Sequence, residues 1–122
     1  MEALNEKAIK ATARFLERKG CEVIDRRWEG PEGIGSIDLV AVDDGELVFV
    51  DVVARRSTEG FPEAHIGREL REILAAKWLG EHGEEYCNVP IRFDDVAMMV
   101  MGSNRALLRH HVNCFGTMEP AE

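Results

Sequence analysis

Two short apolar segments on either side of an Asp-Gly pair constrain the fold of this chain most strongly. Residues 36–42 (SIDLVAV) and 47–53 (LVFVDVV) have the length and the β-branched composition of strands, and each contains a single acidic residue. Between them, residues 43–46 (DDGE) carry the Asp-Gly signal of a tight hairpin turn. The two segments therefore predict a β-hairpin that is apolar on both faces except for its two acids.

The pairing of these acids follows from counting outward from a two-residue turn at positions 44 and 45. Asp38 then lies directly opposite Asp51 on one face of the sheet, with Cβ atoms about 5 Å apart. Two like charges at this distance are costly unless one pKa rises, a cation lies beside them or a divalent metal binds between them. We therefore predict a metal site at Asp38 and Asp51.

Two alternatives to this metal site stay open. One acid can lie at the exposed end of the sheet while the other accepts hydrogen bonds from loop amides. An odd shift of the register would instead place Asp38 and Asp51 on opposite faces of the sheet, because side chains alternate along a strand.

Periodic apolar patterns in the rest of the chain complete an α/β domain. Apolar residues at helical spacing predict two helices, and shorter apolar runs predict three further strands. The predicted helices cover residues 3–19 and 63–82, and the additional strands cover residues 22–28, 96–101 and 107–112. We therefore expect a three-layer α/β/α fold around a mixed, largely antiparallel sheet.

Length, charge and cysteine content narrow the class of protein. The chain has 122 residues, which is the length of one domain, and we expect this domain over residues 1–116 with a frayed tail at 117–122. Its 23 acidic and 15 basic side chains give a net charge of −8, which argues against an unspecific binder of nucleic acid or anionic membranes, although a local basic patch is compatible with it. The sequence contains no signal-peptide pattern, no apolar run of membrane-spanning length and no Cys-x-x-Cys pair. We therefore expect a cytoplasmic protein without membrane association.

Glu6 is a third candidate carboxylate. It lies near the edge of the apolar stripe of the first predicted helix, in line with Ile9 and Ala13. Its side chain can therefore point toward the sheet, or into water as a first-turn acid that the helix dipole favours.

Several motifs, taken in their order and spacing, resemble the YraN-like family of small bacterial proteins. The motifs are Glu6, residues 35–39 (GSIDL), residues 48–52 (VFVDV), Arg55-Arg56-Ser57 and Arg92-Phe93-Asp94. That family is similar to the restriction-endonuclease-like superfamily, in which an Asp is followed on the next strand by (Asp or Glu)-x-Lys. The resemblance implies a restriction-endonuclease-like α/β/α fold and Mg²⁺- or Mn²⁺-dependent cleavage of DNA or RNA, including branched structures such as Holliday junctions.

The chain departs from the family pattern at the motif lysine. The family has Glu-Val-Lys where this chain has Asp51-Val52-Val53, and Ser36 replaces a glutamate. In such sites the acids hold the metal, which lowers the pKa of a water molecule, and the lysine orients or deprotonates that water. Because Val53 does neither, we expect a degraded site with weak or no activity.

Lys77 is the lysine that the sequence offers as a replacement. It lies four residues after Ile73, on the predicted apolar face of the second helix, and in some restriction-endonuclease-like proteins the lysine has moved to a neighbouring helix. The alternative is that its stem covers the edge of the core and its ammonium group reaches water.

Arg55 and Arg56 are the predicted nucleic-acid contacts. Arg55 lies two residues beyond Val53 on the same strand face, where it can bind phosphate but is too basic to act as a general base. The sequence thus favours a nuclease-like protein with a degraded site made of Glu6, Asp38, Asp51 and Lys77. The alternative is a non-catalytic module of the same fold that binds nucleic acid or another protein.

Overall fold

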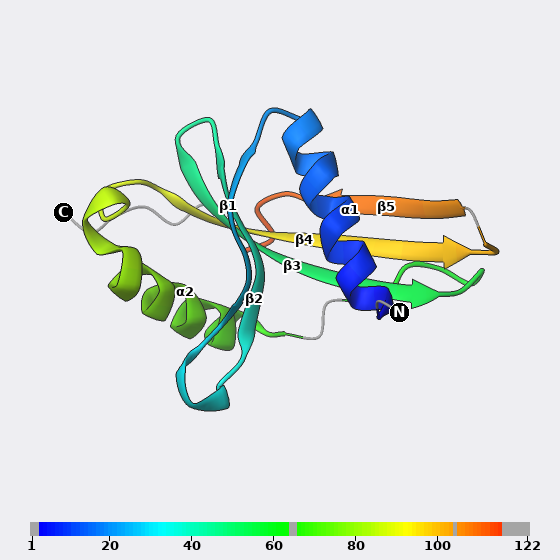
Figure 1. Cartoon of the computed structure of the whole chain (residues 1–122), viewed down its shortest axis with the longest axis horizontal. Coiled ribbons are helices and arrows are strands. Elements are labelled where there is room, and N and C mark those ends of the chain that lie inside the picture. The colour runs from blue at the N-terminus through cyan, green and yellow to red at the C-terminus, as the bar shows by residue number, and fades with distance from the viewer. Residues whose placement is uncertain (1–2, 64–65, 104, 116–122) are drawn as a thin grey trace.

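The fold is a five-stranded mixed sheet with one helix on each face, as the computed structural model shows for residues 3–63, 66–103 and 105–115 (Figure 1). The strands lie in their sequence order, with β3 and β4 parallel and the other neighbours antiparallel. The elements are α1 (Leu4–Arg18), β1 (Glu22–Glu29), η1 (Pro31–Gly33), β2 (Ser36–Asp43), β3 (Glu46–Arg56), α2 (Arg68–His82), η2 (Gly83–Glu85), β4 (Ile91–Met101) and β5 (Arg105–His111). The predicted three-layer α/β/α architecture is confirmed.

The β2–β3 hairpin has the predicted turn and register. Asp44 and Gly45 both adopt positive φ, at 49° and 82°, which the favoured two-residue hairpin turns require. From this turn the ladder runs outward through the Asp43–Glu46 pair to the Leu39–Val50 pair. The ladder therefore ends one step before Asp38 and Asp51.

Two apolar clusters lie on opposite faces of the sheet. Beneath α1, the helix residues Ala8, Ile9, Ala13 and Leu16 pack on Leu39, Ala41, Val48, Val50, Val52, Val96 and Met98. Beneath α2, the helix residues Leu74, Ala75 and Trp78 pack on Ile37, Val40, Leu47, Phe49 and Phe93. Because side chains alternate along a strand, Asp51 lies on the α2 face of β3, between Val50 and Val52 of the α1 face.

The two predicted boundaries that differ most from the structure are the starts of α2 and β4. The second helix begins at Arg68 rather than at residue 63, with Gly67 in extended conformation before it. Strand β4 begins at Ile91 rather than at residue 96. Its charged start resembled a loop, yet Arg92 and Asp94 are buried and hydrogen-bonded to each other, so their charges are compatible with a central strand.

The described part of the chain has no helix that is long and apolar enough to cross a membrane. The predicted tail at residues 117–122 lies outside the described residues.

Candidate functional site

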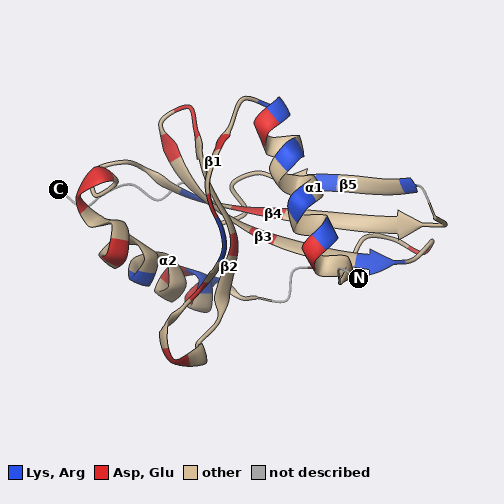
Figure 2. Cartoon of the chain, in the orientation of Figure 1, with Lys and Arg blue, Asp and Glu red and all other residues tan. Residues whose placement is uncertain are grey.

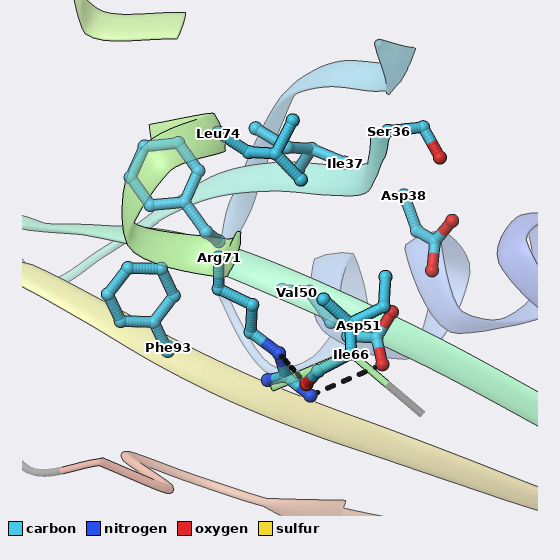
Figure 3. Close-up of a pocket in the computed structure, with 10 residues that line it drawn as sticks. Ser36, Ile37, Asp38, Val50, Asp51, Ile66, Arg71, Leu74 and Phe93 are labelled. Carbon is cyan, nitrogen blue, oxygen red and sulfur yellow. Dashed lines mark hydrogen bonds and ion pairs between the residues drawn. The ribbon is translucent and has the colours of Figure 1, made fainter. Parts of the chain in front are cut away.

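Asp38 and Asp51 line one small cavity between β2, β3 and the start of α2 (Figure 3). The cavity has a volume of about 20 Å³, enough for about one water molecule. It is also lined by Ser36, Ile37, Phe49, Val50, Ile66, Arg71, Leu74 and Phe93. The structure therefore brings together the two acids that the hairpin register pairs.

Asp38 is fixed to the neighbouring strand by its own side chain. The backbone amide of Val52 donates a hydrogen bond of 2.7 Å to Asp38 Oδ2. The carboxylate thus takes the place of a backbone partner just beyond the regular ladder, and Asp38 remains half-buried. This contact holds its carboxylate against β3, on which Asp51 lies.

Arg71 is the basic residue that α2 contributes to the site. Its side chain is only 6% exposed, and its Nη2 atom lies 3.3 Å from Asp51 Oδ2. Its Nη1 atom forms an ion pair with Asp95, and its Nε atom donates a hydrogen bond of 3.0 Å to the Ile66 carbonyl. A buried guanidinium group therefore links the carboxylates of two neighbouring strands.

The role of Arg71 was not predicted from the sequence. The signal that could have revealed it is spacing, because Arg71 precedes Leu74 and Trp78 by three and seven residues and shares their buried face of α2. Asp95 was missed as well, because the predicted β4 began too late to include it. In the parallel ladder Asp95 lies directly opposite Asp51, and His111 of β5 follows Asp95 in the next ladder.

The acid pair suits a divalent cation in chemistry, but Arg71 competes with one. Mg²⁺ prefers carboxylate oxygens and is commonly bound through one or two carboxylates with water completing its shell, so Asp38 and Asp51 fit such an ion. Among the residues that the structure describes, no group of three or more Asp, Glu, His or Cys side chains is arranged to hold a metal ion. A cation here would share Asp51 with the Arg71 guanidinium.

Glu6 lines an open hollow that Asp38 also borders, and it does not line the small cavity. Its Oε1 atom forms an ion pair of 2.9 Å with Arg27 Nη2. Both residues line this open hollow of about 520 Å³ between α1, β1 and β2, together with Ala3, Asn5, Ile9, Glu29, Ser36 and Asp38. Asp38 borders both the hollow and the cavity, whereas Asp51 borders the cavity and not the hollow.

The structure corrects the expected position of Lys77. The side chain was expected on the apolar face of the second helix, but Lys77 is exposed, as is Ile73 at 43%. The buried face of α2 instead contains Arg71, Leu74, Ala75 and Trp78. Lys77 does not line the cavity, and the cation that α2 directs to Asp51 is Arg71.

Arg55 and Arg56 lie at the exposed end of β3, beyond the cavity. Arg55 Nη2 donates a hydrogen bond of 3.3 Å to the Gly60 carbonyl, which fixes it to the loop after β3. Val53, at the position of the motif lysine, is 5% exposed. The chain thus places an apolar side chain where the family pattern has an amine.

A second polar cluster lies on the α1 face of the sheet, around the fully buried Asp94. Arg92 donates hydrogen bonds of 2.9 and 3.0 Å to its two oxygens and also pairs with Asp43 and Glu46. His110 Nε2 lies 2.7 Å from Asp94 Oδ2, and the Asn113 amide donates to Oδ1 at 2.9 Å. Burial by itself would raise the pKa of Asp94, but these hydrogen bonds outweigh it and hold the pKa below its usual value.

With this geometry in place, the chain can be compared with known proteins. Residues 10–98 match the Uncharacterised protein family UPF0102. A UPF0102 protein of Renibacterium salmoninarum is 41% identical over 102 residues, covering 80% of this chain and 83% of the relative. UPF0102 proteins of Beutenbergia cavernae and Rhodococcus jostii are 37% and 35% identical, covering 89% and 93% of this chain and 92% and 96% of the relatives.

The molecule is therefore a three-layer α/β/α domain with a paired-carboxylate cavity at the edge of its central hairpin. It belongs to the UPF0102 family. This membership confirms the resemblance to the YraN-like family that the motifs indicated.

Proposed function

We propose that this protein is a nuclease-like domain with a reduced phosphodiesterase site, which binds DNA or RNA and cleaves it slowly or not at all. The observation that carries the proposal is the convergence of Asp38 and Asp51 on one cavity from the two strands of the hairpin. Two acids on adjacent strands are the metal-holding part of the restriction-endonuclease-like pattern. The proposal places the protein in the cytoplasm, among nucleic-acid substrates that include branched structures.

Asp38 and Asp51 are the residues that would hold Mg²⁺ or Mn²⁺ in this proposal. The ion, when bound, would stabilise charge on the phosphate and lower the pKa of a water molecule. Arg71 neutralises part of the charge on Asp51 and so weakens the attraction of the site for a cation.

Val53 explains why the proposed activity is weak. Its buried isopropyl group neither orients nor deprotonates a water molecule. Loss of a positioned acid or base typically costs about 10²–10⁴-fold in rate. The cleavage rate of the wild-type protein is therefore expected to be lower than that of nucleases with the motif lysine by about this factor.

Cleavage assays with Mn²⁺ on single-stranded and branched DNA and RNA test the proposal. We expect undetectable or very slow cleavage by the wild type, a measurable gain in Val53→Lys, and loss of that gain in Asp38→Asn/Val53→Lys. A Val53→Lys protein that is folded and binds Mn²⁺ but gains no activity would contradict the proposed site.

A non-catalytic interaction module is the second candidate, and the ion pairs of Arg71 favour it. Asp51 and Asp95 are both paired to the guanidinium group of Arg71, so these two carboxylates have a stabilising partner without any metal. This candidate predicts that neither wild type nor Val53→Lys cleaves nucleic acid, and that Mg²⁺ leaves the melting temperature unchanged.

A further inference from the structure

The outer face of α1 carries a row of basic side chains that the proposed cleavage site does not use. Its members are exposed and follow one another at intervals of three or four residues, which places them on one side of the helix. They are Lys7, Lys10, Arg14 and Arg18, called here the basic stripe. The buried face of α1, which includes Ile9 and Leu16, lies on the opposite side. Figure 2 shows blue segments recurring along α1.

Both acids of α1 form ion pairs with arginines of β1. Glu6 is 2.9 Å from Arg27 and Glu17 is 3.9 Å from Arg26, both of β1. Two strand arginines thus compensate the two acidic charges of the helix. In a chain with a net charge of −8, α1 with its four basic and two acidic residues is a local region of positive charge.

The open hollow lies at the N-terminal end of the stripe. Asn5 and Glu6, in the first turn of α1, line it together with Arg27 and Asp38. Asp38 also lines the cavity that contains Asp51. A ligand that follows the stripe toward its N-terminal end therefore comes to the hollow that Asp38 borders.

We propose that the basic stripe of α1 binds the sugar-phosphate backbone of a nucleic-acid strand and leads that strand into the hollow beside Asp38. This inference rests on the proposed function and identifies the surface that its substrate uses. Lys7 and Arg18 are separated by about 16 Å along the helix axis, at 1.5 Å per residue. Successive phosphates of a duplex strand advance about 3.4 Å along its axis, so the stripe is long enough for several phosphate contacts.

The burial of the apolar face of α1 argues against a membrane as the partner. An amphipathic helix that binds a lipid surface inserts its apolar face into the bilayer. In α1 that face is occupied by the sheet, since Ala8, Ala13 and Leu16 are at most 1% exposed. What remains for a partner is a row of cations, which matches a polyphosphate chain.

A matched pair of double variants tests the stripe. Arg14→Gln/Arg18→Gln removes two exposed arginines from α1, and Arg105→Gln/Arg109→Gln removes two exposed arginines with the same spacing from β5. We first check that both variants melt at the same temperature as the wild type. Fluorescence anisotropy between 50 and 300 mM KCl then measures the affinity for a labelled oligonucleotide of random sequence, as a single strand and as a duplex. The α1 variant should bind about 10- to 100-fold more weakly at about 0.1 M salt, and its salt slope should fall by roughly one for each phosphate that it no longer neutralises.

Site-specific crosslinking tests the path into the hollow. A photoreactive group is attached at Asn5→Cys, which lines the hollow, or at Lys77→Cys on the exposed face of α2, each combined with Cys87→Ser to remove the exposed cysteine. We expect crosslinks to the oligonucleotide from position 5 and none from position 77.

The outcomes separate this inference from the proposed function. Equal loss of affinity in both double variants, a larger loss in the β5 variant, or equal crosslinking from both positions overturns the stripe and leaves the reduced nuclease site standing. Wild-type protein that binds no oligonucleotide, or that binds poly-glutamate or anionic vesicles as tightly, overturns the stripe as a nucleic-acid surface. Gain of cleavage in Val53→Lys is a separate readout that reports on the acid pair alone.

Discussion

Two buried polar clusters among the residues that the structure describes each contain an arginine, yet they lie on opposite faces of the sheet and have different surroundings. On the α1 face, Asp94 is fully buried and receives hydrogen bonds from Arg92, His110 and the Asn113 amide. On the α2 face, Arg71 pairs with Asp51 beside a cavity that Asp38 also lines. A carboxylate that is enclosed by its hydrogen-bond partners stabilises the folded structure, whereas a carboxylate beside a cavity can exchange a partner for a ligand.

The neighbouring residues Asp94 and Asp95 show how little sequence distance separates the two roles. Alternation along β4 directs Asp94 to the Arg92 cluster and Asp95 to Arg71 on the other face. The same alternation in β5 turns His110 toward Asp94 and aligns His111 with Asp95. The clusters are therefore separated by the thickness of one sheet and can be perturbed independently.

The largest expected effect is loss of stability in Arg92→Met. Removing the guanidinium leaves Asp94 as a buried charge with fewer partners, and breaking a buried ion pair in this way typically costs about 3–5 kcal/mol. Urea unfolding should show this decrease in the free energy of unfolding. A decrease below about 1 kcal/mol would mean that the α1-face cluster contributes no more than an ordinary hydrogen bond, and the contrast between the two faces would not hold.

Arg71→Met is expected to cost less and to increase the response to Mg²⁺. Asp95 is 22% exposed and Asp51 borders the cavity, so both carboxylates can be hydrated when Arg71 is lost, and we expect a decrease of about 1.5–3 kcal/mol, the usual range for hydrogen bonds to charged groups. Without the competing guanidinium, Mg²⁺ should stabilise this variant more than the wild type, by up to about 2.7 kcal/mol when its concentration is a hundred times Kd.

Thermal unfolding with and without Mg²⁺ measures this difference, and Arg92→Met is the control. Mg²⁺ should raise the melting temperature of Arg71→Met by more than that of the wild type. For Arg92→Met, the shift with Mg²⁺ should be no larger than the shift of the wild type. Adding Asp38→Asn/Asp51→Asn to Arg71→Met should remove the increase. An unchanged increase in that triple variant would place the ion elsewhere and contradict the α2-face site.

The pH dependence of stability should report on Asp94. Its pKa is lowered in the folded protein, so its contribution to stability is fully present above the pKa of the unfolded chain, near 3.8, and is lost as the pH falls through the lower folded pKa. Urea midpoints should therefore fall below about pH 4 in the wild type. In Asp94→Asn the urea midpoint should decrease less below about pH 4. If the midpoint depended on pH identically in both proteins, the decrease would arise from other carboxylates.

The hairpin could be predicted from the sequence because its determinants are local. The Asp44-Gly45 turn fixes the register of the ladder as far as the Leu39–Val50 pair, and Asp38 and Asp51 are the next residues outward on the two strands. Arg71 could not be assigned in this way. Its spacing from Leu74 and Trp78 places it on the buried face of α2, but its pairing with Asp51 and Asp95 depends on how α2 packs over β3 and β4, which spacing within the helix does not determine.

The start of β4 was missed for a related reason. The charged residues Arg92, Asp94 and Asp95 are typical of loops when they are read along the chain, since a buried charge is costly without a partner. Their partners come from other elements, including Asp43 of β2, Arg71 of α2 and His110 of β5. A sequence shows the charges but not the partners that make their burial tolerable.

The smallest effect is expected for Lys77→Ala. This variant tests whether α2 provides the α2-face site, formed by Asp38 and Asp51, with any cation besides Arg71. Lys77 is exposed and does not line the cavity, so its removal should change the free energy of unfolding by less than about 0.5 kcal/mol, as is usual at such surface positions. For the same reason it should change neither the Mg²⁺-induced shift in melting temperature nor any residual cleavage with Mn²⁺. If cleavage by the wild type were detected and disappeared in Lys77→Ala at unchanged stability, a lysine from the exposed side of α2 would be reaching the acids during the reaction. The α2-face site would then be a working catalytic centre in which Arg71 and Lys77 divide the roles of the missing motif lysine.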